Sequence, residues 1–521
     1  MGKDISYTQT LTLTGDVNLI LKDGCEMNVG ESGSEVDGYG IICYDEANNT
    51  YYDLTICGQT AQTGTLSVYT TGQYHYAIGT RHITVNGGNV IAHTDGSGCG
   101  IDTKRSGNVT INRGSVSATT TYTGTFAWPI SAAGNLTING GNVSAKSNSN
   151  AILADGNVAI NGGTVNATGG DGGYSGIYSN GTIEINGGNV TASSIFSASG
   201  TITLGWTRPA DRITASSIST GEGGTVAVAD GQALTDGSGN IYTGTLTASE
   251  LSAFAAETTL QPCLALADAA SNTAAITDHA SQTLAVALSG RTLYKDGSWN
   301  TLCLPFAVED FTGTIFADAK VMTLGNSQAC NTGFDAATGT LNLDFVEADE
   351  IEPGVPYIVK WTRPDDYEGH ESDYDISSPT FTGVTVENES PADHAVVSQD
   401  NYVQFIGTYS PAAIYTADKT NLYLGAANTL YYPTATDFTV NACRAYFQLK
   451  NGLIAGEPKS VGAKGVSQFV LDFGDETTGI RPTPNPSLNG GEWYDLSGRR
   501  LSGKPVTPGL YIHNGNKIVI K

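Results

Sequence analysis

The most informative segment of this chain reads Asn157-Val158-Ala159-Ile160-Asn161-Gly162-Gly163-Thr164-Val165-Asn166-Ala167. Two short apolar alternations, Val158 with Ile160 and Val165 with Ala167, flank the Asn-Gly-Gly in its centre. Residues two apart on a strand point to the same side, so each alternation predicts a strand with one apolar face. Glycine adopts positive φ without a steric clash and Asn tolerates it well, so Asn-Gly-Gly predicts a corner between the strands.

The same phrase occurs five times, and its central Asn recurs at intervals of 22 to 27 residues as Asn86, Asn112, Asn139, Asn161 and Asn186. A period in this range indicates a solenoid in which each repeat forms one coil. Each coil also offers a third short strand with one apolar residue, at Ile41, Ile78, Ile101, Ile130, Ile152, Ile177 and Ile195. Three strands per coil predict a parallel β-helix of about seven coils, right-handed because parallel crossovers almost always are.

Stacked coils place equivalent residues above one another. The five Asn residues are therefore expected to form a ladder joined by side-chain amide hydrogen bonds. The Ile and Val columns are expected to form the core.

The rest of the chain differs in pattern, and the whole protein is expected to be all-β. We expect residues 1–50 to form a cap or an irregular first coil, 51–205 the regular coils, and 206–274 a β-rich cap or connecting module. Residues 275–475 have aromatic-rich alternating strands at loose intervals, which predict an antiparallel β-sandwich. Residues 476–521 combine a proline-stiffened linker with a small C-terminal β module.

Composition excludes some classes of partner. The formal net charge is −26, with 51 acidic and 25 basic residues. This disfavours nucleic acid, which is bound through Lys and Arg, and anionic membrane surfaces. It suits a soluble extracellular protein, or one that binds calcium or neutral ligands. No apolar segment approaches the length of a transmembrane helix.

The eight cysteines show neither a CxxC pair nor a metal-ligand spacing, so no zinc site is expected. Cys43 lies two residues after Ile41, which predicts that it faces the core. Two interpretations stay open for the eight residues, namely small buried thiols or one or more disulfides.

The C-terminal tail carries Tyr494-Asp495-Leu496-Ser497-Gly498-Arg499, Gly509-Leu510-Tyr511-Ile512 and a closing Lys517-Ile518-Val519-Ile520-Lys521. It resembles a shortened type IX secretion C-terminal sorting domain. Segments 299–306, 354–361 and 443–449 also resemble repetitive surface proteins of Gram-negative gut anaerobes, many with β-helical regions described as carbohydrate-binding. The resemblance implies an extracellular or outer-surface location. Met1-Gly2-Lys3-Asp4 is not a signal peptide, so either the protein is cytosolic or a signal segment has been removed, and the C-terminal tail favours the second.

Parallel β-helices often resemble polysaccharide lyases and glycoside hydrolases, so an active site has to be considered. A hydrolase needs two carboxylates that flank the scissile bond, and a lyase needs carboxylates for calcium near a basic residue. Acidic residues are scattered over the regular coils, and one cluster combines acid with base: Asp102, Lys104 and Arg105. These three residues are weak catalytic candidates, because a solvated corner explains them equally well.

A row of aromatic residues is the stronger candidate. Tyr39, Tyr76 and Trp128 lie two residues before a third-strand Ile, and Tyr74 and Phe126 lie four before. Exposed rings can hold the faces of sugars, so these five residues are the predicted ligand-binding set. The alternative is that the rings pack at a corner of the core.

The densest acidic loop contains Asp365, Asp366, Asp373 and Asp375. Spaced carboxylates can bind calcium, which makes these residues weak calcium candidates. The loop lacks an Asp-x-Asp-x-Asp-Gly pattern, so a solvated acidic loop is the competing interpretation. No other cofactor is expected.

These features favour a secreted or cell-surface, non-enzymatic protein that binds a polysaccharide or a host or cell-surface glycan, or that mediates adhesion. A β-helical polysaccharide lyase or glycoside hydrolase is the alternative hypothesis. A structural stalk that displays the sandwich is the third.

Overall fold

The computed structural model describes residues 4–124, 127–254, 258–425, 428–456 and 464–474, together with the backbone of five short strands nearer the C-terminus. The protein is all-β, with 4% helix. It divides into two compact units, residues 1–265 and 266–521.

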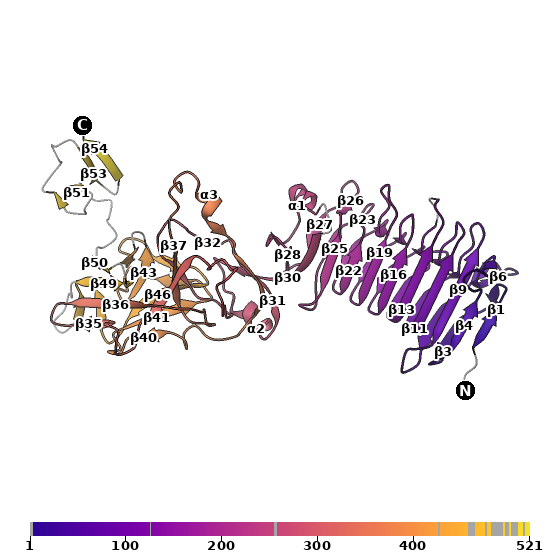
Figure 1. Cartoon of the computed structure of the whole chain (residues 1–521), viewed down its shortest axis with the longest axis horizontal. Coiled ribbons are helices and arrows are strands. Elements are labelled where there is room, and N and C mark those ends of the chain that lie inside the picture. Colours follow the sequence, from indigo (N-terminus) through magenta and orange to yellow (C-terminus); the bar gives the residue numbers. More distant parts are fainter. Residues whose placement is uncertain are drawn as a thin grey trace. The chain divides into compact units, whose positions relative to one another are not determined.

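The first unit is a parallel β-solenoid of about 11 turns, whose stacked strands run along the indigo-to-magenta part of Figure 1. Its third strands form one parallel sheet, here called the third-strand sheet. In order it contains β2 (Leu11–Leu13), β6 (Ile41–Asp45), β10 (Ile78–Thr80), β12 (Ile101–Thr103), β14 (Ile130–Ala132), β17 (Ile152–Ala154), β20 (Ile177–Ser179), β23 (Ile195–Ser197) and β26 (Ile218–Thr220). The other two strands of each coil, such as β18 (Val158–Ile160) and β19 (Thr164–Thr168), form a second, larger sheet.

The predicted apolar columns are confirmed. The seven third-strand Ile residues are direct register partners from coil to coil, and Ile138, Ile160 and Ile185 form another column. The third-strand column also continues beyond both ends of the predicted set, to Leu11 and to Ile218. The estimate of seven coils is therefore too low, because it rested on the third-strand Ile residues from Ile41 to Ile195 and further coils lie beyond both.

The asparagine ladder is confirmed as well. Each side-chain amide donates to the side-chain carbonyl of the preceding Asn, at 2.7–2.8 Å, from Asn186 back to Asn86. Glycine is required at the end of the corner: Gly163 has φ +85°, and a Cβ there would lie 2.5 Å from the carbonyl oxygen of Gly141. The second glycine of the corner thus allows consecutive coils to approach closely, whereas Arg113 takes the first position in one repeat.

The two ends of the solenoid differ. At the C-terminal end, β30 (Thr258–Ala267) runs antiparallel to β25 (Arg212–Ala215) and to β28 (Ala233–Thr235). This reversal of direction closes the parallel stack. At the N-terminal end, β1 (Ile5–Tyr7) and β3 (Val17–Leu21) pair in parallel with β4 (Glu26–Val29) and β8 (Leu54–Gly58). Parallel strand pairing between coils therefore already begins within residues 1–50, which were expected to form a cap or an irregular first coil.

The second unit contains a β-sandwich. One sheet has the order β33 (Asn300–Leu302), β37 (Tyr357–Trp361), β34 (Ala319–Leu324), β36 (Thr340–Glu347), β49 (Gln468–Asp472) and β50 (Thr477–Ile480). The other has the order β40 (Val396–Val397), β41 (Val403–Thr408), β46 (Arg444–Leu449), β43 (Asn421–Gly425) and β44 (Thr429–Tyr431). Their pairings are antiparallel apart from β36 with β49. Side chains of both sheets share one core, in which Phe405 and Phe447 stack with ring centroids 4.5 Å apart.

The tail forms a small antiparallel sheet of β52 (Arg500–Leu501), β51 (Trp493–Tyr494), β53 (Gly509–His513) and β54 (Asn516–Ile520). Residues 495–499 and 521 of the sorting-like motifs lie outside the described residues. Among the helices that the structure describes, none has the length and apolar character that crossing a membrane requires.

Candidate functional site

Two of the aromatic residues predicted from the sequence, Tyr39 and Tyr76, lie on the outer surface of the third-strand sheet. Tyr39 and Tyr76, which precede β6 and β10, stack with centroids 5.4 Å apart and planes inclined by 30°. Gly79 follows the inward-facing Ile78 and therefore faces outward. A Cβ on Gly79 would lie 3.3 Å from Cδ2 of Tyr76, so the Tyr76 ring covers the outer side of β10. Both tyrosines are half-buried.

The other members of the predicted set occupy different environments. The backbone bonds from Ala77 N to Cys99 O (3.0 Å) and from Gly100 N to Trp128 O (3.3 Å) align Tyr76, Cys99 and Trp128 in successive coils. Trp128 is half-buried. Tyr74 is 66% exposed in a loop. Phe126 lies outside the described residues.

The predicted acid–base cluster lies next to these rings. Asp102 and Lys104 form an ion pair, although Asp102 is 5% exposed. Lys104 Nζ also donates to Tyr76 Oη at 2.7 Å and lies 3.9 Å from the centroid of that ring. Burial raises the pKa of Asp102 in spite of the nearby ammonium group. The Asp102 carboxylate is thus covered, and it holds Lys104 against Tyr76.

Arg105 does not join this ion pair. It is exposed, has φ +55°, and its guanidinium lies 6.0 Å from the centroid of Tyr51. Of the three weak catalytic candidates, the structure therefore brings Asp102 and Lys104 together and leaves Arg105 at the surface.

Sequence reasoning missed a second group of apolar side chains on the same surface. Leu153, Tyr178 and Phe196 are register partners in β17, β20 and β23, and all three are half-buried. The rings of Tyr178 and Phe196 lie 5.6 Å apart. Strand alternation could have found them, because each directly follows an inward-facing Ile and so points outward.

We call the surface that carries Tyr39, Tyr76, Trp128, Tyr178 and Phe196 the outer aromatic face. From the coil of Tyr76 to the coil of Phe196 there are five steps along the register of the third-strand sheet. At roughly 4.8 Å per step, this part of the face is about 24 Å long. Its length and its partly exposed rings suit an extended ligand better than a compact one.

Three of the four predicted calcium ligands have separate partners. Asp375 accepts from Tyr367 Oη at 3.0 Å and from Lys295 N at 2.8 Å, whereas Asp366 accepts from Tyr374 Oη at 2.6 Å. Asp373 lies 3.3 Å from His370, and Asp365 is exposed. The described residues contain no group of three or more His, Cys, Asp or Glu side chains arranged to hold a metal ion.

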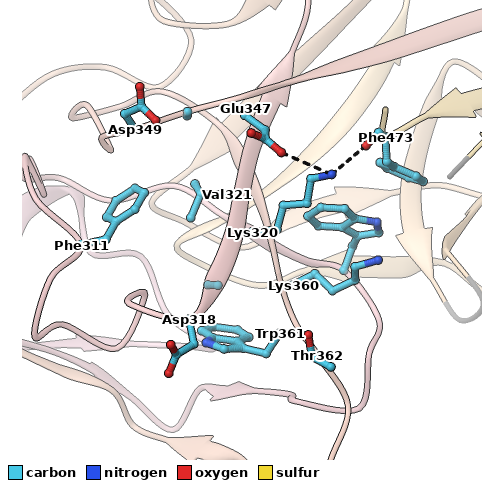
Figure 2. A pocket seen from close by; sticks show the side chains of 13 residues that line it. Phe311, Asp318, Lys320, Val321, Glu347, Asp349, Lys360, Trp361, Thr362 and Phe473 are labelled. Carbon is cyan, nitrogen blue, oxygen red and sulfur yellow. Dashed lines mark hydrogen bonds and ion pairs between the residues drawn. The ribbon is translucent and has the colours of Figure 1, made fainter. Parts of the chain in front are cut away.

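The second unit has a cavity of about 520 Å³, and the residues that line it are far apart in the sequence. Lys320 and Lys360 are direct cross-strand partners in β34 and β37. In Figure 2, Lys320 points toward Glu347 and Phe473, to which its Nζ lies at 3.4 Å (Oε1) and 3.0 Å (backbone oxygen). Lys360 Nζ lies 4.9 Å from the ring centroid of Trp299. Strand pairing creates this site, so no local motif signals it.

No disulfide joins the eight cysteines, all of which lie in the described part of the chain, and Cys43 and Cys99 are buried in the solenoid. Burial raises the pKa of Cys43 to about 12, so its thiol stays protonated near neutral pH.

The outer aromatic face is the feature of the first unit that best fits a ligand. No protein-family model, curated protein or solved structure matches the chain.

Proposed function

We propose that the protein binds glycan chains on the outer aromatic face and has no catalytic activity. The observation that carries this proposal is the row of half-buried rings on one side of the third-strand sheet, with Tyr39 stacked on Tyr76 and Tyr178 beside Phe196. Aromatic rings present apolar faces that contact the C–H groups of sugars, while phenol and amine groups can bond to hydroxyls. A free binding surface requires exposed ring area, which half-buried rings provide.

The burial of Asp102 supports a binding function over an enzymatic one. Its carboxylate is 5% exposed and ion-paired with Lys104. A general acid or base must come within hydrogen-bond reach of the substrate, and this carboxylate lies beneath Lys104. The same ion pair positions Lys104 on Tyr76, where it shapes the surface of the face.

The proposed location is extracellular or on the outer cell surface. It is supported by the resemblance of the tail to a type IX sorting domain and by the strongly acidic composition. Use of that secretion route is part of the proposal.

A glycan array, read beside reducing-sugar and unsaturated-product assays, tests this function. We expect binding of at least one polysaccharide without turnover, weakened several-fold by Tyr178→Ala and by Phe196→Ala. Tyr415→Ala, an exposed tyrosine of the second unit (56% exposed), is the matched control and should bind normally. Turnover that disappears in Asp102→Ala would instead identify an enzyme, and silence in every assay would favour a structural stalk.

A further inference from the structure

A second cavity of the β-sandwich unit has a basic wall. It measures about 360 Å³, and Arg291 and Arg444 line it. No Asp or Glu of the described chain belongs to this lining. Acidic residues outnumber basic ones by 51 to 25 in the sequence, so a wall with two arginines and no carboxylate runs against the composition. Such a concentration of positive charge selects for an anion.

One of the two arginines already has a carboxylate partner. Arg444, the first residue of β46, contacts Oδ1 of Asp268 through its Nη1. The other carboxylate oxygen of Asp268 accepts from Asn441 Nδ2 at 2.7 Å. Asp268 is thus hydrogen-bonded to Arg444 and Asn441, and it acts on Arg291 only through its charge, which raises the pKa of Arg291.

Arg291 lies between β31 (Thr283–Ser289) and β32 (Thr292–Leu293) and is 2% exposed. Its terminal nitrogens donate to the backbone carbonyls of Cys443 and Thr301. Its Nε has no hydrogen-bond acceptor among the described residues. Burial and the charge of Arg444 both lower the pKa of Arg291. A buried charged donor without an acceptor is unfavourable, and an oxyanion in the adjoining cavity would supply an acceptor and additional negative charge.

Aromatic side chains line the same cavity. Trp299 is 7% exposed, and its indole Nε1 likewise has no acceptor within the described part of the chain. Tyr294 and Phe438 are 51% and 38% exposed. Phe438 stacks on Tyr423 with centroids 3.9 Å apart, which fixes its orientation. A ligand that enters this cavity therefore meets ring faces as well as guanidinium groups.

We propose that this cavity binds the carboxylate of a uronic acid, with Arg291 and Arg444 facing the carboxylate and Tyr294 and Phe438 contacting the sugar ring. Guanidinium groups bond to carboxylates more strongly than to neutral hydroxyls, and aromatic faces pack on sugar rings. The site belongs to the second unit and does not depend on glycan binding by the solenoid.

Calorimetric titration and thermal melting of the full chain test the site. The ligands are glucuronate and galacturonate, with glucose, acetate and inorganic phosphate as comparisons. We expect saturable binding of a uronate with an increase in Tm, at least about tenfold tighter than for glucose, because a charge-assisted hydrogen bond contributes at least that factor.

Variants separate the roles of the lining residues. Arg291→Met should weaken uronate binding by at least about tenfold. Because Arg291 is buried, its loss also perturbs folding, so Tyr294→Ala and Phe438→Ala provide an independent test on exposed side chains. Each should weaken uronate binding several-fold and leave the melting temperature of the ligand-free protein nearly unchanged. Lys320→Met removes a positive charge from the other cavity and is the matched control, which should bind as the wild type does.

Four results would overturn the proposal. These are no saturable binding of either uronate by the wild type, equal binding of glucose, equal binding of acetate or phosphate, and unchanged uronate affinity in both Tyr294→Ala and Phe438→Ala. The first three are measured on the unaltered protein, so none depends on whether a variant folds.

Discussion

The side-chain amide of Asn161 donates to the side-chain carbonyl of Asn139 at 2.7 Å, across 22 residues of sequence. Asn161 also accepts from Asn186 at 2.8 Å. One side chain therefore joins three consecutive coils, and the repeated Asn contributes to the stacking of the coils as well as to the corner.

Replacement of Asn161 by Ala removes both bonds and leaves Asn139 and Asn186 each without one partner. We expect a loss of about 1–2 kcal/mol in the free energy of unfolding, measured by denaturant titration. Asn142→Ala is the control, because Asn142 is an exposed residue of the neighbouring repeat phrase and should change stability by less than about 0.5 kcal/mol. Equal effects of the two changes would show that the ladder adds nothing to stability.

Ile160→Asp tests the apolar column. Ile160 is 0% exposed and lies between Ile138 and Ile185. We expect a loss greater than the roughly 2–5 kcal/mol typical of Ile→Ala in a core, because the carboxylate is also desolvated. Thr137→Asp, on the outward side of the adjacent coil, should be tolerated. Similar melting temperatures for the two variants would contradict the inward and outward assignment of these positions.

The sequence allowed prediction of those parts of the fold that repeat. Residues equivalent to Asn161, Gly163 and Ile160 recur in successive repeats. Strand alternation and backbone sterics therefore predicted the asparagine ladder, the glycine corner and the apolar column. The coil count was underestimated because Leu11 and Ile218 continue the same column beyond Ile41 and Ile195, in the less regular coils at the two ends. Where a terminal coil lacks the corner motif, the apolar residue of the third strand is the sequence feature that still identifies the coil.

The candidate site was partly predictable for a related reason. The backbone alignment of Tyr76, Cys99 and Trp128 follows from the coil register. The ion pair of Asp102 with Lys104, and the contact of Lys104 with Tyr76, depend on side-chain directions that spacing does not determine. The cavity of Arg291 and Arg444 was beyond sequence reasoning, since its walls come from strands more than 100 residues apart.

Lys104→Met should be costly because it leaves Asp102 buried without its cation. We expect a loss of about 3 kcal/mol, at the lower end of the range for breaking a buried ion pair, since Lys104 remains 27% exposed. The same substitution in an Asp102→Asn background should cost clearly less, because no buried carboxylate remains. A double-mutant cycle by denaturant titration measures the difference, and strict additivity would mean that the two side chains do not interact.

Trp128→Ala separates packing from binding on the outer aromatic face. Because Trp128 is half-buried, the loss of stability should be smaller than the roughly 3–5 kcal/mol of a fully buried Trp→Ala change. Glycan binding should fall sharply, since the ring forms part of the proposed contact surface. A thermal melt and a binding curve on the same sample check both. A large loss of stability with unchanged binding would place Trp128 in the core and outside the site.

The last prediction concerns Asp211, which holds the corner of the coil where the asparagine ladder has ended. Its Oδ2 accepts from the backbone N–H groups of Thr207 at 2.9 Å and Arg208 at 2.8 Å. Burial opposes ionisation of this carboxyl, but the N–H donors outweigh burial and hold the pKa of Asp211 below its usual value.

A depressed pKa in the folded state means that the carboxylate contributes stability above the pKa of the unfolded chain, about 3.9. This contribution is lost as the pH falls through the lower folded-state pKa. Thermal melts from pH 7 to pH 3 should therefore show a gap between the wild type and Asp211→Asn that is largest near neutral pH and narrows below about pH 4. A gap that stays constant over this range would show that the ionised form of Asp211 is not what stabilises the corner, and that an amide in its place fails for reasons of shape.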